Sequence, residues 1–165
     1  MIVYLVGMPG AGKSVVGREL AGRLGVPFVD LDSEIEREAG ASVPEIFDRE
    51  GEASFRALEA AALVKASTND PSVVACGGGI VLEPANRITL RNTGVAVYLD
   101  VPLEELRRRV RPAEDRPLIR QEGDLERLLE ARGPLYREFA GHVVDGRGDP
   151  GEVADAIVEE LRWSA

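Results

Sequence analysis

A chain of 165 residues with 44% hydrophobic and 30% charged residues has the length and the ordinary composition of one soluble, globular domain. The formal net charge of −9 argues against a nucleic-acid-binding surface, and no apolar run approaches the length that spans a bilayer. The N-terminus carries no basic leader or cleavage signal, so we expect one cytoplasmic domain over residues 1–165.

Predicted strands and helices alternate along the whole chain. Apolar, β-rich runs predict strands at 2–6, 27–32, 72–76, 95–99 and 143–144. Helical spacing and capping residues predict helices at 13–24, 33–39, 42–51, 52–66, 84–91, 102–109, 124–132 and from 149 onward. This alternation predicts an α/β fold with a parallel sheet covered on both faces, which binds ligands at the carboxyl ends of its strands.

Two segments between these elements carry predictions of their own. We expect Gly133-Pro134 to end the helix that begins at Asp124, because proline cannot donate the backbone hydrogen bond of a helix interior. Residues 111–123 show no periodicity, and a loop of this length in a compact domain is often a functional lid. We expect the lid to span about residues 110–123.

The segment between the first predicted strand and helix carries the clearest motif. Residues 7–14 read Gly-Met-Pro-Gly-Ala-Gly-Lys-Ser and fit the phosphate-binding pattern G-x-x-x-x-G-K-[ST]. Backbone N–H groups of such a loop surround phosphate oxygens, the lysine reaches the β- and γ-phosphates, and the hydroxyl ligates Mg²⁺. The predicted nucleotide-binding residues here are Gly10, Ala11, Gly12, Lys13, Ser14 and Val15.

Two acids follow the second predicted strand. Asp30 and Asp32 lie two residues apart, so strand geometry would direct both side chains to one side. One could hold Mg²⁺ while the other orients and deprotonates a hydroxyl acceptor. The third predicted strand, 72–76, carries no acid where many P-loop ATPases have one, which favours Asp30 as the metal ligand beside Ser14 and leaves Asp32 as the candidate base.

Glycines and arginines supply the remaining candidates for the site. Gly77, Gly78 and Gly79 follow the third strand and offer bare N–H groups beside a ligand. Residues 107–120 hold six arginines against two acids, which suggests a local anion site, and Arg116 in the predicted lid could offset charge in a phosphoryl-transfer transition state. The only cysteine and the only histidine, Cys76 and His142, leave no Cys/His metal site.

In combination and order, these motifs resemble the shikimate kinase family. The resemblance covers nearly the whole chain and rests on these segments: 7–14, Asp30-Leu31-Asp32, Glu45-Ile46-Phe47, Gly51-Glu52, Phe55-Arg56, Gly77-Gly78-Gly79, Arg116-Pro117-Leu118 and Pro134-Leu135-Tyr136-Arg137. It implies ATP-dependent phosphorylation of the 3-hydroxyl of shikimate, on the route to chorismate and aromatic amino acids. It also implies a three-layer P-loop kinase fold with a five-stranded sheet in the order 2-3-1-4-5.

The resemblance further implies roles for individual residues. Lys13 and Ser14 match the phosphate and Mg²⁺ positions, Asp30 matches the metal-side acid, and Arg116 matches the lid arginine on ATP. The positions that match shikimate-binding residues are Asp32, Arg56, the glycines 77–79 and Arg137, with a substrate-binding subdomain at about 32–60. The arginine that contacts adenine matches one of Arg107, Arg108, Arg109 and Arg111, of which Arg108 and Arg109 are preferred.

Other functions remain to be weighed against this one. Gluconate kinases are similar in size but typically follow their paired acids with His-Pro, whereas Asp32 is followed by Ser33-Glu34-Ile35. A nucleoside monophosphate kinase would need a base pocket, which nothing here suggests. A catalytically idle nucleotide sensor would predict damage at Lys13, Asp32 or Arg116, and all three are intact. Without heptads or an exposed apolar stripe, we expect a monomer.

Overall fold

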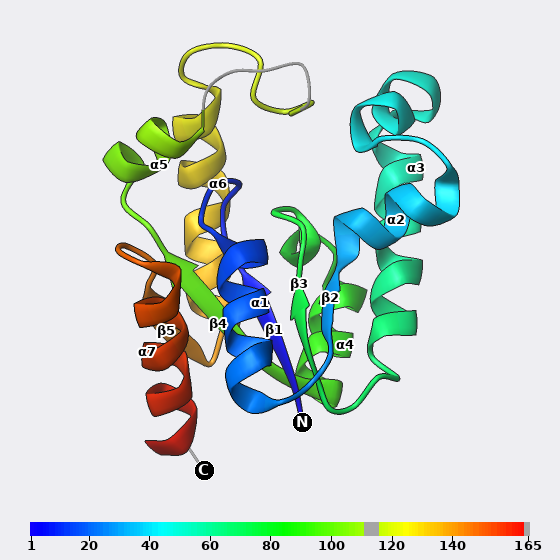
Figure 1. Ribbon diagram of the computed structural model, residues 1–165. Helices are drawn as coiled ribbons and strands as arrows, with labels where there is room; N and C mark the ends of the chain where they lie inside the picture. The colour runs from blue at the N-terminus through cyan, green and yellow to red at the C-terminus, as the bar shows by residue number, and fades with distance from the viewer. Residues whose placement is uncertain (111–115, 164–165) are drawn as a thin grey trace.

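The computed structural model describes residues 1–110 and 116–163 (Figure 1). Its centre is a five-stranded parallel sheet in the order β2-β3-β1-β4-β5, as predicted. The strands are β1 (Ile2–Val6), β2 (Phe28–Asp30), β3 (Ser72–Ala75), β4 (Gly94–Asp100) and β5 (His142–Asp145). Every residue of β1 is buried because this strand pairs with β3 on one side and β4 on the other.

Helices cover both faces of this sheet. They are α1 (Lys13–Leu24), α2 (Leu31–Ala39), α3 (Val43–Ala66), α4 (Pro84–Thr93), α5 (Leu103–Arg109), α6 (Asp124–Phe139) and α7 (Pro150–Trp163), with a short 3-10 helix η1 at Ile80–Leu82. Helices α1 and α7 pack together on one face, and α4 and α6 contact β4 from the other (Figure 1). Helix α3 kinks at Gly51, where φ is 84°, so the two helices predicted at 42–51 and 52–66 meet there.

The end of the second strand differs from the prediction. β2 stops at Asp30, and Leu31 and Asp32 already belong to α2. The Asp30 carboxylate accepts a hydrogen bond from the Ser33 amide at 3.2 Å, so this side chain caps the helix and sets its first residue. The expectation that Asp30 and Asp32 share one side of a strand is therefore wrong.

Helix α6 also differs from the prediction, because Gly133 and Pro134 do not end it. The helix runs on to Phe139, although a proline inside a helix costs about 3 kcal/mol. Continuing the helix buries Tyr136 and Phe139, and the Tyr136 ring stacks on Tyr98 with centroids 5.1 Å apart. Burying two aromatic side chains contributes a free energy of the same order as the proline penalty, so tertiary packing decides this helix.

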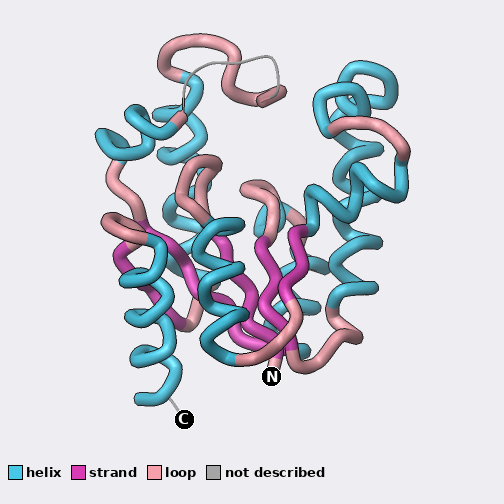
Figure 2. The backbone as a smooth tube through the Cα atoms, viewed as in Figure 1, coloured by secondary structure: helices cyan, strands magenta, loops and turns pink. Residues whose placement is uncertain are grey.

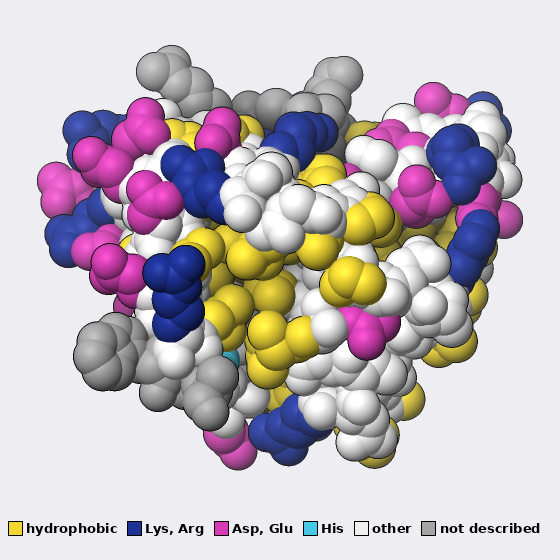
Figure 3. All heavy atoms as spheres, turned by 60° about the horizontal axis from the view of Figure 1, so that its bottom comes forward, with side chains coloured by type: hydrophobic (Ala, Val, Ile, Leu, Met, Phe, Trp, Pro, Cys, Tyr) yellow, Lys and Arg dark blue, Asp and Glu magenta, His cyan; other side chains and the backbone are white. Residues whose placement is uncertain are grey.

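Two arms rise above the carboxyl ends of the strands (Figures 1 and 2). Helix α2 and the first part of α3 form one arm, and α5 with the segment 116–123 forms the other. The surface seen from the opposite end mixes acidic, basic and apolar side chains, with no continuous basic area in that view (Figure 3). Within the described residues, no helix combines the length and apolarity that crossing a membrane requires.

Candidate active site

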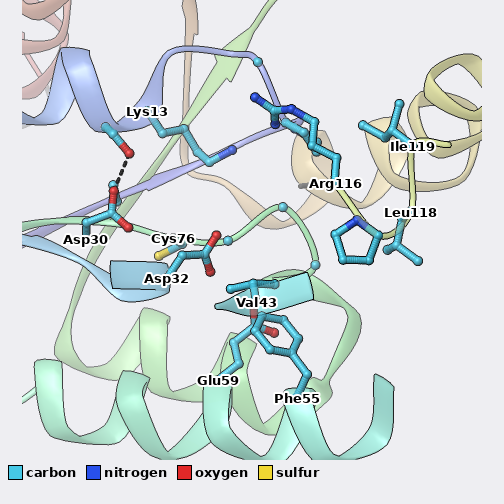
Figure 4. A pocket seen from close by; sticks show the side chains of 18 of the residues that line it. Lys13, Asp30, Asp32, Val43, Phe55, Glu59, Cys76, Arg116, Leu118 and Ile119 are labelled. Atoms are coloured by element: carbon cyan, nitrogen blue, oxygen red, sulfur yellow. Dashed lines mark hydrogen bonds between the residues drawn. The ribbon is translucent and has the colours of Figure 1, made fainter. Parts of the chain in front are cut away.

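A cavity of about 680 Å³ lies between the two arms, above the carboxyl edge of the sheet (Figure 4). Its lining comes from the loop before α1, from α2 and α3, from the glycines after β3, and from residues 116–119 and α6. Segments far apart in the sequence thus meet at the edge where a parallel sheet of this topology binds its ligand. Nearly all of the residues proposed from sequence patterns lie in or beside this cavity.

The loop before α1 has the curled backbone that its motif predicts. Gly10 has a φ of 84°, and a Cβ there would lie 2.1 Å from Val110, so only glycine fits. The Lys13 ammonium lies at the inner rim of the loop and donates hydrogen bonds to the carbonyl oxygens of Gly7 and Met8, at 2.7 and 2.9 Å. Burial lowers the pKa of Lys13 to about 8, and the nearby Asp32 carboxylate opposes this shift.

The rest of the predicted phosphate loop is distributed around this lysine. Gly10, Gly12, Ser14 and Val15 line the cavity, and Val15 leaves half of its surface exposed there. Ala11 is buried instead and does not line the cavity, and its N–H donates to the carbonyl oxygen of Met8 at 3.1 Å. Ser14 stands at the start of α1, where the helix dipole adds partial positive charge.

The two aspartates have different environments. The Ser14 hydroxyl donates to Oδ2 of Asp30, which ties this acid to the phosphate loop. Asp32, on the first turn of α2, points into the cavity (Figure 4), and its Oδ1 is buried without a hydrogen-bond partner in the structure. Burial, and then the neighbouring Asp30 charge, raise the pKa of Asp32 above its usual range. A buried acceptor without a partner indicates a place for a donor from a ligand.

The glycine turn after β3 is shaped by charged side chains that crowd it. A Cβ on Gly79 would lie 2.2 Å from Arg56 Nη1, and one on Gly77 would lie 2.7 Å from Glu59 Oε2. The Arg56 guanidinium pairs with Glu59 at 2.9 Å and with Glu52 at 3.2 Å, while its Nε has no partner among the described residues. A side chain at Gly77 or Gly79 would therefore displace Glu59 or Arg56, whereas one at Gly78 would press on Pro9 at 3.1 Å.

Glu59 is a functional candidate that the sequence analysis missed. Its side chain is fully buried. One carboxylate oxygen accepts a hydrogen bond from Arg56, and the other has no partner within the part of the chain that the structure describes. Burial raises the pKa of Glu59, and the Arg56 charge opposes this shift. An acid one turn after Phe55 on the otherwise apolar stripe of α3 is the sequence signal that could have revealed it.

Arg137 does not lie where the sequence analysis expected it. Its side chain is 57% exposed, pairs with Asp100 and is absent from the cavity lining among the described residues. Arg132 takes its place: it is 5% exposed, lines the cavity and lies 3.4 Å from the Cβ position of Gly78. Arg132 falls on the buried stripe of α6, one turn before Tyr136, and a charge on that stripe is the signal that was overlooked.

The two arginines proposed for adenine differ in position. Arg109 donates to the carbonyl oxygens of Gly10 and Gly146 at 3.3 and 3.2 Å, so it lies against the phosphate loop. The Arg108 side chain is 75% exposed and pairs with Glu105, away from the loop. The structure thus favours Arg109 over Arg108 as the residue beside a nucleotide.

The predicted lid is described from residue 116 onward, and its positions 111–115 lie outside the described residues. Arg116 extends over the cavity toward Lys13, and Leu118 and Ile119 line the same side (Figure 4). From the same segment, Arg120 approaches Asp48 of the opposite arm at 3.5 Å. The segment therefore borders the space between the phosphate loop and the arm built from α2 and α3.

These features together define a P-loop kinase: a phosphate loop, a parallel sheet in the order β2-β3-β1-β4-β5, and a cavity that has polar side chains for a second ligand opposite the loop. The shikimate kinase family model matches residues 9–162. A shikimate kinase from Aromatoleum aromaticum is 50% identical to this chain, and the match covers 98% of this chain and 95% of that relative. A shikimate kinase from Halorhodospira halophila is 49% identical, and the match covers 97% of this chain and 93% of that relative. The solved structure of a shikimate kinase from Acinetobacter baumannii, in complex with shikimate, superposes on this protein with a TM-score of 0.95. Its sequence is 40% identical, and the superposition covers 99% of this chain and 93% of the solved chain. The chain belongs to the shikimate kinase family, and it is an ATP-dependent kinase.

Proposed function

We propose that this kinase transfers the γ-phosphoryl group of ATP to the 3-hydroxyl of shikimate, giving shikimate 3-phosphate and ADP for aromatic biosynthesis. The observation that carries the proposal is a pair of largely buried arginines, Arg56 and Arg132, beside the glycine turn of a cavity whose other end is the phosphate loop. Shikimate has a carboxylate at one end and hydroxyls at the other, and it suits a cavity with an anion-binding half.

The acceptor half would bind the carboxylate through both arginines. A guanidinium matches a planar carboxylate with two parallel hydrogen bonds, and Arg56 Nε is a buried donor that no described residue engages. The Asp32 carboxylate, with its free Oδ1, would then accept the proton of the attacking hydroxyl. The glycines 77–79 would present backbone N–H groups to the ring hydroxyls or the carboxylate.

The nucleotide half would hold ATP between the phosphate loop and Arg109. Lys13 would exchange its two carbonyl contacts for phosphate oxygens, and Arg116 would approach from the lid segment to offset charge that develops on the transferred group. Arg109 already contacts the loop and would lie beside the nucleotide's base.

The residues beside the loop fit Mg²⁺. Ser14 and Asp30 bring a hydroxyl and a carboxylate oxygen together, and Mg²⁺ prefers such ligands along with water and substrate phosphates. When bound, Mg²⁺ neutralises phosphate charge during transfer. Asp30 would hold the ion or its water, whereas Asp32 faces the acceptor. We further propose that the enzyme acts as a cytoplasmic monomer.

A turnover assay with purified protein, ATP and Mg²⁺ tests this function. Shikimate should be phosphorylated at its 3-hydroxyl, as judged by phosphorus NMR of the product, and gluconate should not be. Lys13→Ala should fold and bind shikimate but show no turnover. Phosphorylation of gluconate in preference to shikimate, or turnover by Lys13→Ala at the wild-type rate, would contradict the proposal.

A further inference from the structure

A buried tyrosine hydroxyl holds the glycine turn from behind. Tyr136 lies one turn after Arg132 on α6, is fully buried, and donates a hydrogen bond to the carbonyl oxygen of Gly78. Tyr136 does not line the cavity, whereas Gly77, Gly78 and Gly79 all do. The contact therefore reaches the turn on the side away from the ligand space.

This contact fixes an otherwise permissive backbone. Three consecutive glycines have no side chains to lock their dihedral angles, and glycine adopts a wide range of them. In a planar trans peptide the C=O and N–H groups point in opposite directions. Because Tyr136 holds the Gly78 carbonyl away from the cavity, the N–H of Gly79 in the same peptide is directed toward it.

The tyrosine itself is held firmly and remains a donor. Its ring stacks on Tyr98 at 5.1 Å, and burial raises its pKa well above the usual range, so the hydroxyl stays protonated at every working pH. The peptide that it orients lies between two cations: Arg132 adjoins Gly78, and Arg56 adjoins Gly79. An N–H group there is close to where the acceptor's anionic end would bind.

We propose that Tyr136 is a positioning residue for the acceptor, because its hydroxyl aims the N–H group of the Gly78–Gly79 peptide at the anionic end of the substrate. The inference rests on the proposed function, since it assumes shikimate as the acceptor. Helix α6 then contributes two residues to acceptor binding. Arg132 binds the acceptor directly, and Tyr136 orients the Gly79 N–H group as a second donor.

Tyr136→Phe keeps the stacked ring and removes only the hydroxyl. Because that hydroxyl also interacts with Arg132, the Gly79 amide measurement below separates the aimed peptide from an effect through Arg132. The matched control is Tyr4→Phe, which removes the hydroxyl of a buried tyrosine. This hydroxyl bonds Thr93 at 2.7 Å, and neither residue lines the cavity. We expect Tyr136→Phe to raise KM for shikimate about 3- to 10-fold, the range for one lost neutral hydrogen bond. KM for ATP should stay within about twofold, and Tyr4→Phe should change neither constant.

Other outcomes would overturn the role. An unchanged KM for shikimate, an equal rise of both KM values, or a fall in kcat alone would show that the hydroxyl supports only folding or another step. A wild-type enzyme that does not phosphorylate shikimate would instead refute the proposed function, so the two failures are distinguishable.

A spectroscopic measurement does not depend on turnover. In protein labelled with ¹⁵N-glycine, shikimate should shift the Gly79 amide resonance of the wild type, and the shift should shrink in Tyr136→Phe. If the variant does not fold, the wild-type titration decides, because a Gly79 resonance that shikimate leaves unmoved overturns the inference.

Discussion

Arg132 and Arg137 lie on the same helix, and replacing each with lysine separates two possible carboxylate ligands. Both substitutions keep the positive charge but lose the forked pair of N–H donors. Arg132 is buried in the cavity, whereas Arg137 is exposed and pairs with Asp100. We expect only Arg132→Lys to weaken shikimate binding.

The expected size follows from these environments. A hydrogen bond to a charged group is worth about 1.5 to 3 kcal/mol, so Arg132→Lys should weaken shikimate affinity about 10- to 150-fold. An exposed ion pair contributes about 0 to 1 kcal/mol, so Arg137→Lys should change affinity by less than about fivefold. Arg56→Lys would be a less clean variant, because it also disturbs the buried ion pair with Glu59.

Calorimetric titration with shikimate and, separately, with ATP measures both effects. ATP affinity should stay within about twofold in each variant, because Arg132 lies beside Gly78 in the acceptor half of the cavity and Arg137 pairs with Asp100. A large loss of shikimate affinity in Arg137→Lys with none in Arg132→Lys would refute the placement drawn from the buried face of α6. Equal losses of ATP and shikimate affinity in Arg132→Lys would show a general structural defect.

Three further predictions concern the phosphate side of the cavity. Asp32→Asn should lower kcat by about 10² or more, because the proton acceptor is lost. Asp30→Asn should instead raise the Mg²⁺ concentration needed for the half-maximal rate. If steady-state kinetics show the reverse pattern, the roles assigned to the two aspartates are interchanged. Arg116→Ala should lower kcat by up to about 10³ and leave shikimate affinity unchanged. A normal kcat in steady-state kinetics would show that Arg116 takes no part in phosphoryl transfer. Because the pKa of Lys13 is lowered to about 8, its charge is present below pH 8 and is lost as pH rises through that value. ATP affinity of the free enzyme, measured by titration, should therefore fall above pH 8 by up to about tenfold per pH unit, whereas Lys13→Met should bind more weakly with no such dependence.

Several features of this protein are determined locally, and the sequence alone was enough to predict them. The phosphate loop depends on eight consecutive residues whose glycines permit its curled backbone, so its position and the roles it suggests needed no tertiary information. The alternation of apolar runs with helical stripes likewise indicated a parallel sheet, and the family resemblance supplied the strand order that the structure confirms. The kink at Gly51 was also visible as a break between two helical patterns.

Other features depended on contacts between distant segments. Whether Pro134 ends α6 was decided by the burial of Tyr136 against Tyr98 on β4, which no local pattern reveals. The rotation of α6 against the sheet also turns Arg132 into the cavity and leaves Arg137 outside it. Similarly, Arg108 and Arg109 are chemically identical neighbours, and only the packing of α5 against the phosphate loop places one of them there. Local preferences fix much of the backbone, but the path of α6 through Pro134 and the choice among identical side chains follow from long-range packing. That packing sets how each helix is rotated against the sheet.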